Sequence, residues 1–276
     1  MSNRQHSTKL DATGKTVFED IYTAPDPRPY CQTMQALDYA IPEQAQPMFS
    51  ELFADYREQS GKQSVRVLDL GSSYGINAAL LKHDLGLPAL YQRYTTEDAL
   101  SLTTDELLAR DRQDYGQITN NHLDVVGFDI SAPALDYATQ AGLLLESIEA
   151  NLERDDLTRR QQHQLAKIDC IISSGCIGYV TTQTLEKILI ACAPARPWMG
   201  HCVLRMFSLD GLTALLHEFG YEMDILPEPV KQRRFASIEE QTRVLSSLIE
   251  LGVDTEGYED QGWLYAWLIR TKPKIQ

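Results

Sequence analysis

VLDLGSSYGINAAL, residues 67–80, is the stretch that decides the fold. An apolar run containing Asp69 leads into a turn punctuated by Gly71 and Gly75, and the pattern then becomes helical. Glycines permit a tight turn and a close approach of the backbone to a ligand. Because open α/β sheets bind ligands at the carboxyl ends of their strands, this order of strand, turn and helix predicts a site for a nucleotide-like cofactor.

From residue 65 onward, apolar runs alternate with helical patterns. Continuous apolar strands that alternate with helices indicate a parallel sheet that is covered on both faces. We therefore predict an α/β fold, a Rossmann-like, seven-stranded, mostly parallel sheet with helices on both faces. The strands are expected at residues 65–70, 123–129, 143–147, 167–173, 201–207, 220–226 and 262–269.

The chain is expected to fall into two parts. Residues 1–60 are predicted to form an N-terminal tail and a helical cap or lid. Within them, residues 1–16 are expected to be a flexible tail, and a helix is expected to start at Pro42. Residues 61–276 are predicted to form the Rossmann-like domain. It is interrupted by an insertion at 87–121 and a helical insertion at 227–261.

Composition excludes several classes of partner. The formal net charge is −14, and the cluster Lys231, Arg233 and Arg234 is too short for a nucleic-acid-binding surface. No run approaches the roughly 20 apolar residues that a membrane span needs. The N-terminus lacks the apolar core of a secretory signal. We expect a cytoplasmic protein with a small-molecule partner and neither nucleic acid nor membrane; the oligomeric state stays open.

Metal and disulfide chemistry are also not expected. The five cysteines contain no CxxC pair, and the six histidines are scattered without the spacing of metal ligands. The cysteines stand mostly in apolar runs, which is typical of buried free thiols.

The glycine loop separates two classes of cofactor. A dinucleotide loop that starts at Gly71 needs its third glycine at position 76, where Ile76 stands. A carboxylate at Asp69 would repel a pyrophosphate at the helix N-terminus, and it suits a ligand that carries positive charge. S-adenosylmethionine has an ammonium and a sulfonium and no phosphate, so it fits this loop.

Asp69, Gly71, Ser73 and Gly75 resemble motif I of the class I S-adenosylmethionine-dependent methyltransferases, with serine at 73 where that family more often has glycine. The resemblance spans roughly residues 60–270 and implies that the loop wraps the methionine part of the cofactor. The N-terminal PDPR element, the glycine loop and the QRRF segment together look like one bacterial subgroup of this family.

The same resemblance implies further cofactor contacts. Asp129 ends the second predicted strand and matches the acid that holds the two ribose hydroxyls of the cofactor. Asn151 and Leu152 stand where the family places its adenine contacts. Ser174 belongs to the segment that ends the fourth predicted strand, where cofactor and acceptor meet.

The acceptor side has less specific candidates. Tyr22 and Tyr30 could stack on a sulfonium by cation–π attraction, and Tyr179 follows the fourth predicted strand, where it would line the reaction centre. Arg28 could clamp a carboxylate of cofactor or substrate, and Arg205 needs a partner that is either catalytic or structural. Alternatively, the tyrosines pack the cap onto the sheet and Arg28 pairs with a local acid.

Three functions are compatible with these residues. The primary prediction is an S-adenosylmethionine-dependent methyltransferase that acts on a small molecule in specialised metabolism. Such transfer needs alignment more than acid–base help, because the leaving group is a neutral thioether. By similarity to azetidine-2-carboxylate synthases, the alternative is cyclisation of S-adenosylmethionine to azetidine-2-carboxylate with release of methylthioadenosine. The third is a non-catalytic adenosyl-binding module or partner subunit.

Overall fold

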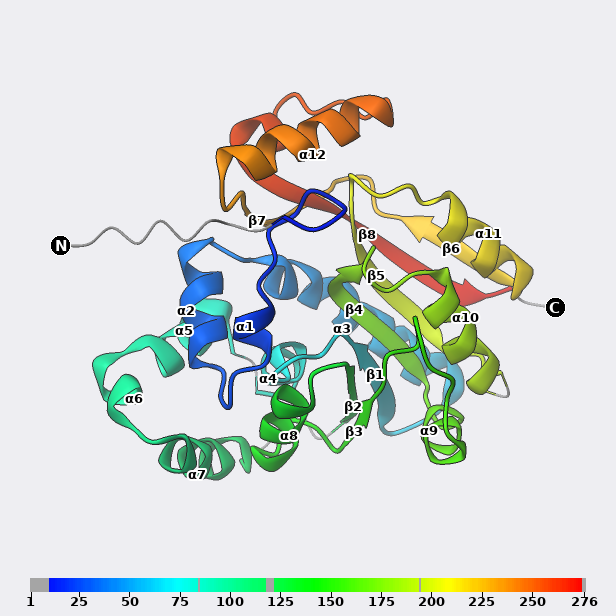
Figure 1. Ribbon diagram of the computed structural model, residues 1–276. Coiled ribbons are helices and arrows are strands. Elements are labelled where there is room, and N and C mark those ends of the chain that lie inside the picture. The colour runs from blue at the N-terminus through cyan, green and yellow to red at the C-terminus, as the bar shows by residue number, and fades with distance from the viewer. Residues whose placement is uncertain (1–9, 84, 118–121, 194, 275–276) are drawn as a thin grey trace.

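The computed structural model describes residues 10–83, 85–117, 122–193 and 195–274. An eight-stranded sheet runs through the molecule in the order β3-β2-β1-β4-β5-β8-β6, and β7 pairs with β8 (Figure 1). The strands are β1 (Val65–Leu70), β2 (Leu123–Asp129), β3 (Glu146–Glu149), β4 (Cys170–Ile177), β5 (Trp198–Leu204), β6 (Tyr221–Ile225), β7 (Val230–Arg234) and β8 (Trp263–Pro273).

The sheet is mostly parallel, as predicted. Strands β3, β2, β1, β4 and β5 pair in parallel, and β8 is antiparallel to its neighbours β5, β6 and β7. The predicted α/β class is therefore confirmed. The sheet has one strand more than predicted, because β7 lies inside the expected helical insertion. Its sequence, VKQRR, hides it, since the inward-facing Gln232 and Arg233 are polar and are still only 3% exposed each.

Helices cover both faces of the sheet (Figure 1). One core contains side chains of α3, α4 and α8, and the other contains side chains of α9, α10 and α11. The helices are α1 (Glu19–Tyr22), α2 (Arg28–Ala36), α3 (Ile41–Ser60), α4 (Ile76–His83), α5 (Leu87–Thr95), α6 (Glu97–Ser101), α7 (Thr104–Tyr115), α8 (Ala132–Gln140), α9 (Arg159–Leu165), α10 (Thr182–Ala191), α11 (Asp210–Glu218), α12 (Ile238–Glu250) and the 3-10 helix η1 (Glu259–Gln261).

β1 faces both cores, which explains why four of its six residues are apolar. Val65 and Val67 point into the core beside α3, whereas Leu68 and Leu70 point into the opposite core. A strand that is buried on both faces has no solvent side for polar residues. Asp69 is therefore an exception that needs an explanation.

The insertion at 87–121 is held by one buried carboxylate. Asp111 is 0% exposed and accepts hydrogen bonds from the hydroxyls of Tyr94 at 2.6 Å and Tyr137 at 2.8 Å. Arg93 Nη2 lies 2.7 Å from the same carboxylate. Because Tyr137 belongs to α8, this cluster fixes α5 and α7 to the Rossmann-like sheet. Residues 118–121 of the predicted insertion lie outside the described residues.

Residues 10–16 differ from the expected flexible tail. Residues 1–9 lie outside the described residues, but Leu10 and Thr16 form an antiparallel bridge. Thr16 is 5% exposed, and its backbone N–H donates to Glu240 Oε1 at 2.8 Å. This segment passes beneath α12 in the view of Figure 1. This polar segment is held in place because the buried carboxylate of Glu240 accepts a hydrogen bond from its backbone.

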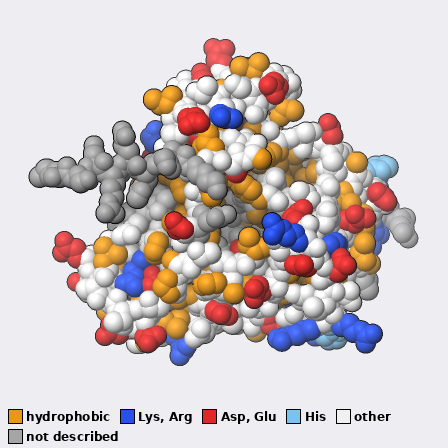
Figure 2. Space-filling model, in the orientation of Figure 1, with side chains coloured by type: hydrophobic (Ala, Val, Ile, Leu, Met, Phe, Trp, Pro, Cys, Tyr) orange, Lys and Arg blue, Asp and Glu red, His pale blue; other side chains and the backbone are white. Residues whose placement is uncertain are grey.

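The surface is acidic, in line with the net charge of −14. Acidic side chains are spread over the visible face, whereas basic side chains occur singly or in small groups (Figure 2). Within the described part of the chain, no helix combines the length and apolar character needed to cross a membrane.

The packing of α3 on the sheet gives a stability prediction. Phe49 is 0% exposed and lies against Gly200 of β5, where an added Cβ would sit 3.0 Å from the Phe49 ring. We expect Phe49→Ala to lower the free energy of unfolding by about 3–5 kcal/mol in urea denaturation. The control Glu58→Ala, at an exposed position of α3, is expected to change it by less than about 0.5 kcal/mol. Equal effects of the two substitutions would contradict this packing.

Candidate functional site

The loop after β1 is a tight turn that requires both glycines. Gly71 has a φ of +74°, and its N–H donates to the carbonyl of Phe128 at 2.8 Å. A Cβ at this position would lie 2.7 Å from Cys176 Cβ, closer than side chains pack. Gly75 has a φ of +75°, and its N–H donates to Ser72 O at 2.9 Å. The loop is thus pressed against the ends of β2 and β4.

Ser73 adopts the backbone conformation of a glycine. Its φ is +48°, in the left-handed region that few non-glycine residues occupy. Its N–H donates to Asp129 Oδ2 at 2.8 Å, and this bond holds the strained residue in place. Ser73 Oγ is buried and has no hydrogen-bond partner among the described residues. The serine is therefore tolerated at a position where glycine would fit without strain.

Asp129 is placed at the end of β2 and faces the loop. Oδ1 accepts from Ser131 N at 2.9 Å, and Oδ2 accepts from Ser73 N. Burial raises the pKa of this carboxyl, while the backbone donors of Ser131, Ser73 and Ile130 oppose that rise. Because a carboxylate oxygen has two lone pairs, each can accept a further donor from a ligand. The two bonds orient the carboxylate before any ligand binds.

Asp69 is a fully buried carboxylate that forms no ion pair with a described residue. It is 0% exposed, and Oδ1 accepts from Asn77 Nδ2 at 2.8 Å. Oδ2 has no hydrogen-bond partner in the described part of the chain. Burial raises the pKa of Asp69 to about 7; the Asn77 hydrogen bond lowers it, and the charge of Asp129 adds to the rise. Oδ2 can therefore accept a hydrogen bond from a ligand or lie against its positive charge.

Asn77 is a site residue that the sequence analysis missed. Its Nδ2 also donates to Ser174 Oγ at 3.0 Å, so Asn77 joins the ends of β1 and β4. Ser174, in the segment that ends β4, is thus linked to Asp69 through Asn77; its role in cofactor binding stays a prediction. The signal for Asn77 was a single polar residue in the first turn of the otherwise apolar INAALL.

Four tyrosines connect the N-terminal segment to the loop. Ring centroids are 5.6 Å apart for Tyr22 and Tyr30, 6.0 Å for Tyr30 and Tyr74, and 6.3 Å for Tyr74 and Tyr137. The Tyr74 hydroxyl donates to the carbonyls of Ile21 at 3.0 Å and Ala24 at 2.8 Å. A residue of the glycine loop therefore anchors α1 and the residues that follow it.

The predicted catalytic tyrosines differ in exposure. Tyr30 is 4% exposed and is buried among other tyrosine rings, which fits the alternative that it packs the cap. Tyr22 is 37% exposed, and its pKa is raised to about 12 by burial, with Arg233 acting to lower it and Asp129 to raise it. The Tyr22 phenol therefore lies within range of both the Asp129 carboxylate and a cation of β7.

Tyr179 lies in the turn after β4. Its N–H donates to Cys176 O at 3.0 Å, and its side chain is 45% exposed. Lys15 Nζ stands over the Tyr179 ring at 4.6 Å from the centroid. The sequence analysis placed Lys15 in the flexible tail and missed it. Its only signal was the GKT tripeptide at residues 14–16.

The two predicted substrate-binding arginines form local ion pairs. Arg28 binds Asp26 through Nε at 2.9 Å and Nη2 at 2.6 Å, and its Nη1 donates to Leu102 O at 2.6 Å. Arg205 Nη1 donates to Glu259 Oε2 at 3.0 Å. In both cases the guanidinium forms an ion pair with an acid of the same chain, as a structural arginine does. A role in substrate binding has no support from these contacts.

The predicted adenine contacts lie after β3. The carbonyl of Asn151 accepts from Asp155 N at 2.8 Å, which closes a turn. The Leu152 side chain is 1% exposed and belongs to the core beside α9, α10 and α11. Leu152 is thus core, while Asn151 is half-buried at the carboxyl edge of the sheet.

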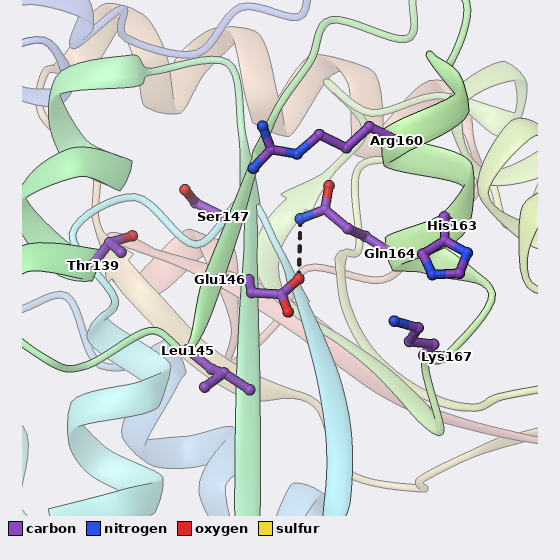
Figure 3. A pocket seen from close by; sticks show the side chains of 8 residues that line it. All are labelled: Thr139, Leu145, Glu146, Ser147, Arg160, His163, Gln164 and Lys167. Carbon is purple, nitrogen blue, oxygen red and sulfur yellow. Dashed lines mark hydrogen bonds between the residues drawn. The ribbon is translucent and has the colours of Figure 1, made fainter.

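A separate open hollow of about 560 Å³ lies beside edge strand β3 and α9 (Figure 3). Within it Gln164 Nε2 donates to Glu146 Oε2 at 3.0 Å. None of the predicted site residues lines it, so it is distinct from the loop after β1. Its lining consists of Thr139, Leu145, Glu146, Ser147, Arg160, His163, Gln164 and Lys167. No group of three His, Cys, Asp or Glu side chains that could hold a metal occurs in the described ranges.

No model of a known protein family matches the sequence, and no curated protein matches it. Among solved structures, the chain is similar to a TehB-like S-adenosylmethionine-dependent methyltransferase from Corynebacterium glutamicum ATCC 13032. The identity is 13%, the TM-score is 0.41, and the match covers 80% of this chain and 86% of that chain.

Two further structures are similar at the same level. The magnesium protoporphyrin IX methyltransferase ChlM from Synechocystis PCC 6803, with bound S-adenosylmethionine, has 11% identity and a TM-score of 0.40 over 83% of this chain and 79% of that chain. The plantazolicin methyltransferase BamL has 13% identity and a TM-score of 0.41 over 80% and 82%. Likeness at this level carries no argument about activity. The α/β fold rests on the sheet of this chain itself.

Substitutions at Ser73 and Gly71 are expected to change the free energy of unfolding in opposite directions. Ser73→Gly is expected to raise the free energy of unfolding by about 0.5–1 kcal/mol, because it relieves the left-handed strain. Gly71→Ala is expected to lower it by about 1–3 kcal/mol or more, because the new Cβ meets Cys176 and the φ is strained. Urea denaturation of both variants measures the difference. A Gly71→Ala protein as stable as the wild type would contradict the loop geometry.

Proposed function

We propose that the loop after β1 binds S-adenosylmethionine and that the protein transfers the methyl group to a small-molecule acceptor. The observation that carries the proposal is the fully buried Asp69 carboxylate, whose Oδ2 has no partner in the described residues. It stands at the carboxyl end of a parallel strand beside a glycine turn, where α/β sheets bind ligands.

The electrostatics favour a cation over a pyrophosphate. Asp69 and Asp129 act on each other through their charges, and neither forms an ion pair with a described residue. A unit positive charge 4 Å from a carboxylate gains about 4 kcal/mol at an effective dielectric constant near 20. Each negative charge of a pyrophosphate at the same distance would instead be repelled by a similar energy. The ammonium or sulfonium of S-adenosylmethionine supplies the missing charge.

Asp129 supports the ribose part of the proposal. Its two oxygens are oriented by Ser131 N and Ser73 N, and each keeps an acceptor site for a ligand hydroxyl. Adjacent ribose hydroxyls match that pair of acceptors. Asn151, at the carboxyl edge beyond β3, is then the candidate for contacts with the adenine.

Methyl transfer requires that the acceptor nucleophile be aligned with the methyl carbon and that water be excluded. The methyl carbon is attacked by the acceptor nucleophile while the carbon–sulfur bond breaks and its electron pair moves to sulfur. Because the thioether leaves as a neutral group, positioning supplies most of the effect. Tyr22 and Tyr179 are proposed to lie against the methyl group of the bound cofactor. The assignment of the acceptor to specialised metabolism stays a prediction.

Cyclisation of S-adenosylmethionine by its own amine stays the alternative, but no contact in the site favours it over methyl transfer. The product distinguishes the two reactions. We expect the pure protein to leave S-adenosylmethionine intact and to release S-adenosylhomocysteine only after a small-molecule extract is added, as detected by mass spectrometry. Methylthioadenosine formed without an acceptor would contradict methyl transfer and support cyclisation.

The cofactor assignment is tested by binding. We expect Asp129→Ala to weaken the affinity for S-adenosylmethionine by about ten- to a hundredfold in calorimetry, because hydrogen bonds to a charged acceptor are lost. The matched control is Asp136→Ala, at an exposed position of α8, with unchanged affinity expected. Unchanged affinity in both variants would contradict a ribose site at Asp129.

The raised pKa of Asp69, about 7 in the free protein, predicts a pH dependence of binding. A cationic ligand favours the ionised carboxylate, so binding below pH 7 must expel a proton. We expect the affinity for S-adenosylmethionine to fall about tenfold per pH unit between pH 7 and pH 5.5. The Asp69→Asn variant is expected to bind weakly and without this slope. A wild-type affinity that is independent of pH in this range would show that Asp69 does not meet the cation.

A further inference from the structure

The N-terminal segment 10–16 brings one lysine into the site. Asp11 Oδ1 accepts from Thr13 N at 2.8 Å and from Lys15 N at 3.1 Å, which closes a turn. Thr16 N then docks on Glu240 of α12. As a result Lys15 points inward and is only 5% exposed, with its Nζ over the Tyr179 ring.

The ammonium of Lys15 has no anion of its own. Nearby Glu240 receives Arg233 Nη1 at 2.9 Å and Nη2 at 2.7 Å, together with two backbone N–H groups, from Thr16 and Ala236. In the described part of the chain, Lys15 Nζ forms no hydrogen bond and no ion pair. The buried Glu240 carboxylate is therefore saturated by Arg233 and the two backbone donors, and Lys15 forms no bond to it.

The charges around Lys15 explain the protonation state of its amine. The groups that face Nζ are Arg233 of β7, Glu240 of α12, Asp11 of its own turn and the ring of Tyr179. Burial and then the charge of Arg233 lower the pKa of Lys15 to about 7, while Glu240 and Asp11 act in the opposite direction. At pH 8 most of the amine is accordingly neutral.

Two tyrosines, Tyr22 and Tyr179, connect the surroundings of Lys15 to the acids of the glycine loop. The Tyr22 phenol is influenced by both Arg233 and Asp129, and the Tyr179 phenol by Arg233, Asp11 and Tyr22. The site thus has an acidic side, Asp69 and Asp129, and a basic side, Lys15 with Arg233. A ligand that carries an ammonium and a carboxylate on the same carbon, as an α-amino acid does, has one group for each side.

We propose that Lys15 binds the carboxylate of the ligand's amino-acid part, and that its amine takes up a proton from solvent as the carboxylate arrives. This inference rests on the proposed binding of S-adenosylmethionine. The new bond is a charge-assisted hydrogen bond between the ammonium and a carboxylate oxygen, in a place shielded from water. It also makes residues 10–16 part of the binding site, since the ligand then holds them down.

Titration calorimetry of the full chain with S-adenosylmethionine at pH 8, in phosphate and in Tris, tests the proposal. The two buffers differ in ionisation enthalpy, so the comparison counts protons. We expect the wild type to take up about one proton more than Lys15→Met, and Lys15→Met to bind about tenfold or more weakly. Lys15→Arg is expected to keep much of the affinity without that proton, because a guanidinium is always charged.

Two controls make the result specific. Decarboxylated S-adenosylmethionine, which lacks the carboxylate, is expected to bind the wild type and Lys15→Met equally. Lys167→Met, at an exposed position, is expected to behave as the wild type. Lys15→Met is expected to fold with an unchanged or higher melting temperature, because it removes a buried amine without a partner.

The proposal is overturned if wild type and Lys15→Met take up equal numbers of protons, or if decarboxylated S-adenosylmethionine loses as much affinity as the parent compound. An effect of Lys15→Met on turnover alone also overturns it, since Lys15 would then act on the acceptor. In these cases the wild type still binds S-adenosylmethionine and the proposed function stands. A wild type that does not bind it at millimolar concentration overturns both.

Discussion

The buried carboxylate of Asp69 is the constraint around which the site is organised. Its burial without a cation raises its pKa from 3.8 to about 7, which corresponds to about 4 kcal/mol of lost stability. Because the folded-state pKa is the higher one, this loss accumulates as the pH rises from about 4 to about 7 and is complete above. A ligand that binds only the folded protein and supplies a positive charge would recover part of this stability.

Asp69 also explains the backbone around it. Gly71 and Ser73 turn the chain with positive φ angles, so that N–H groups point to the end of β2. Asn77 in the first turn of α4 reaches back to Asp69 and across to Ser174. The strain at Ser73 and the unpaired oxygen of Asp69 occur within one turn, which is typical of a binding site rather than of a structural loop.

The wall opposite the loop is built from segments that are far apart in sequence. Ser131 Oγ donates to Tyr22 O at 2.5 Å, and Tyr74 holds the carbonyls of Ile21 and Ala24. At the other end, Glu240 of α12 binds both residue 16 and Arg233. The N-terminal segment is therefore held by the glycine loop and the residue before α8 on one side, and by α12 on the other.

The fold could be predicted from the sequence because its signals are local: an apolar strand, a glycine turn and a helix recur along the chain. Arg28 could have been assigned as well, since its partner Asp26 is two residues away. Arg205 could not, because Glu259 lies 54 residues further on. β7 was missed because its buried arginine is neutralised by α12. Lys15 was also missed, because only the docking of residues 10–16 against the distant α12 buries it.

Equilibrium binding of S-adenosylmethionine and NAD to the full-length protein tests the central claim most directly. The claim is that the loop after β1 is built for a cation and not for a pyrophosphate. We expect saturable binding of S-adenosylmethionine at micromolar concentration and no measurable binding of NAD under the same conditions. Saturable binding of NAD without binding of S-adenosylmethionine would contradict the account.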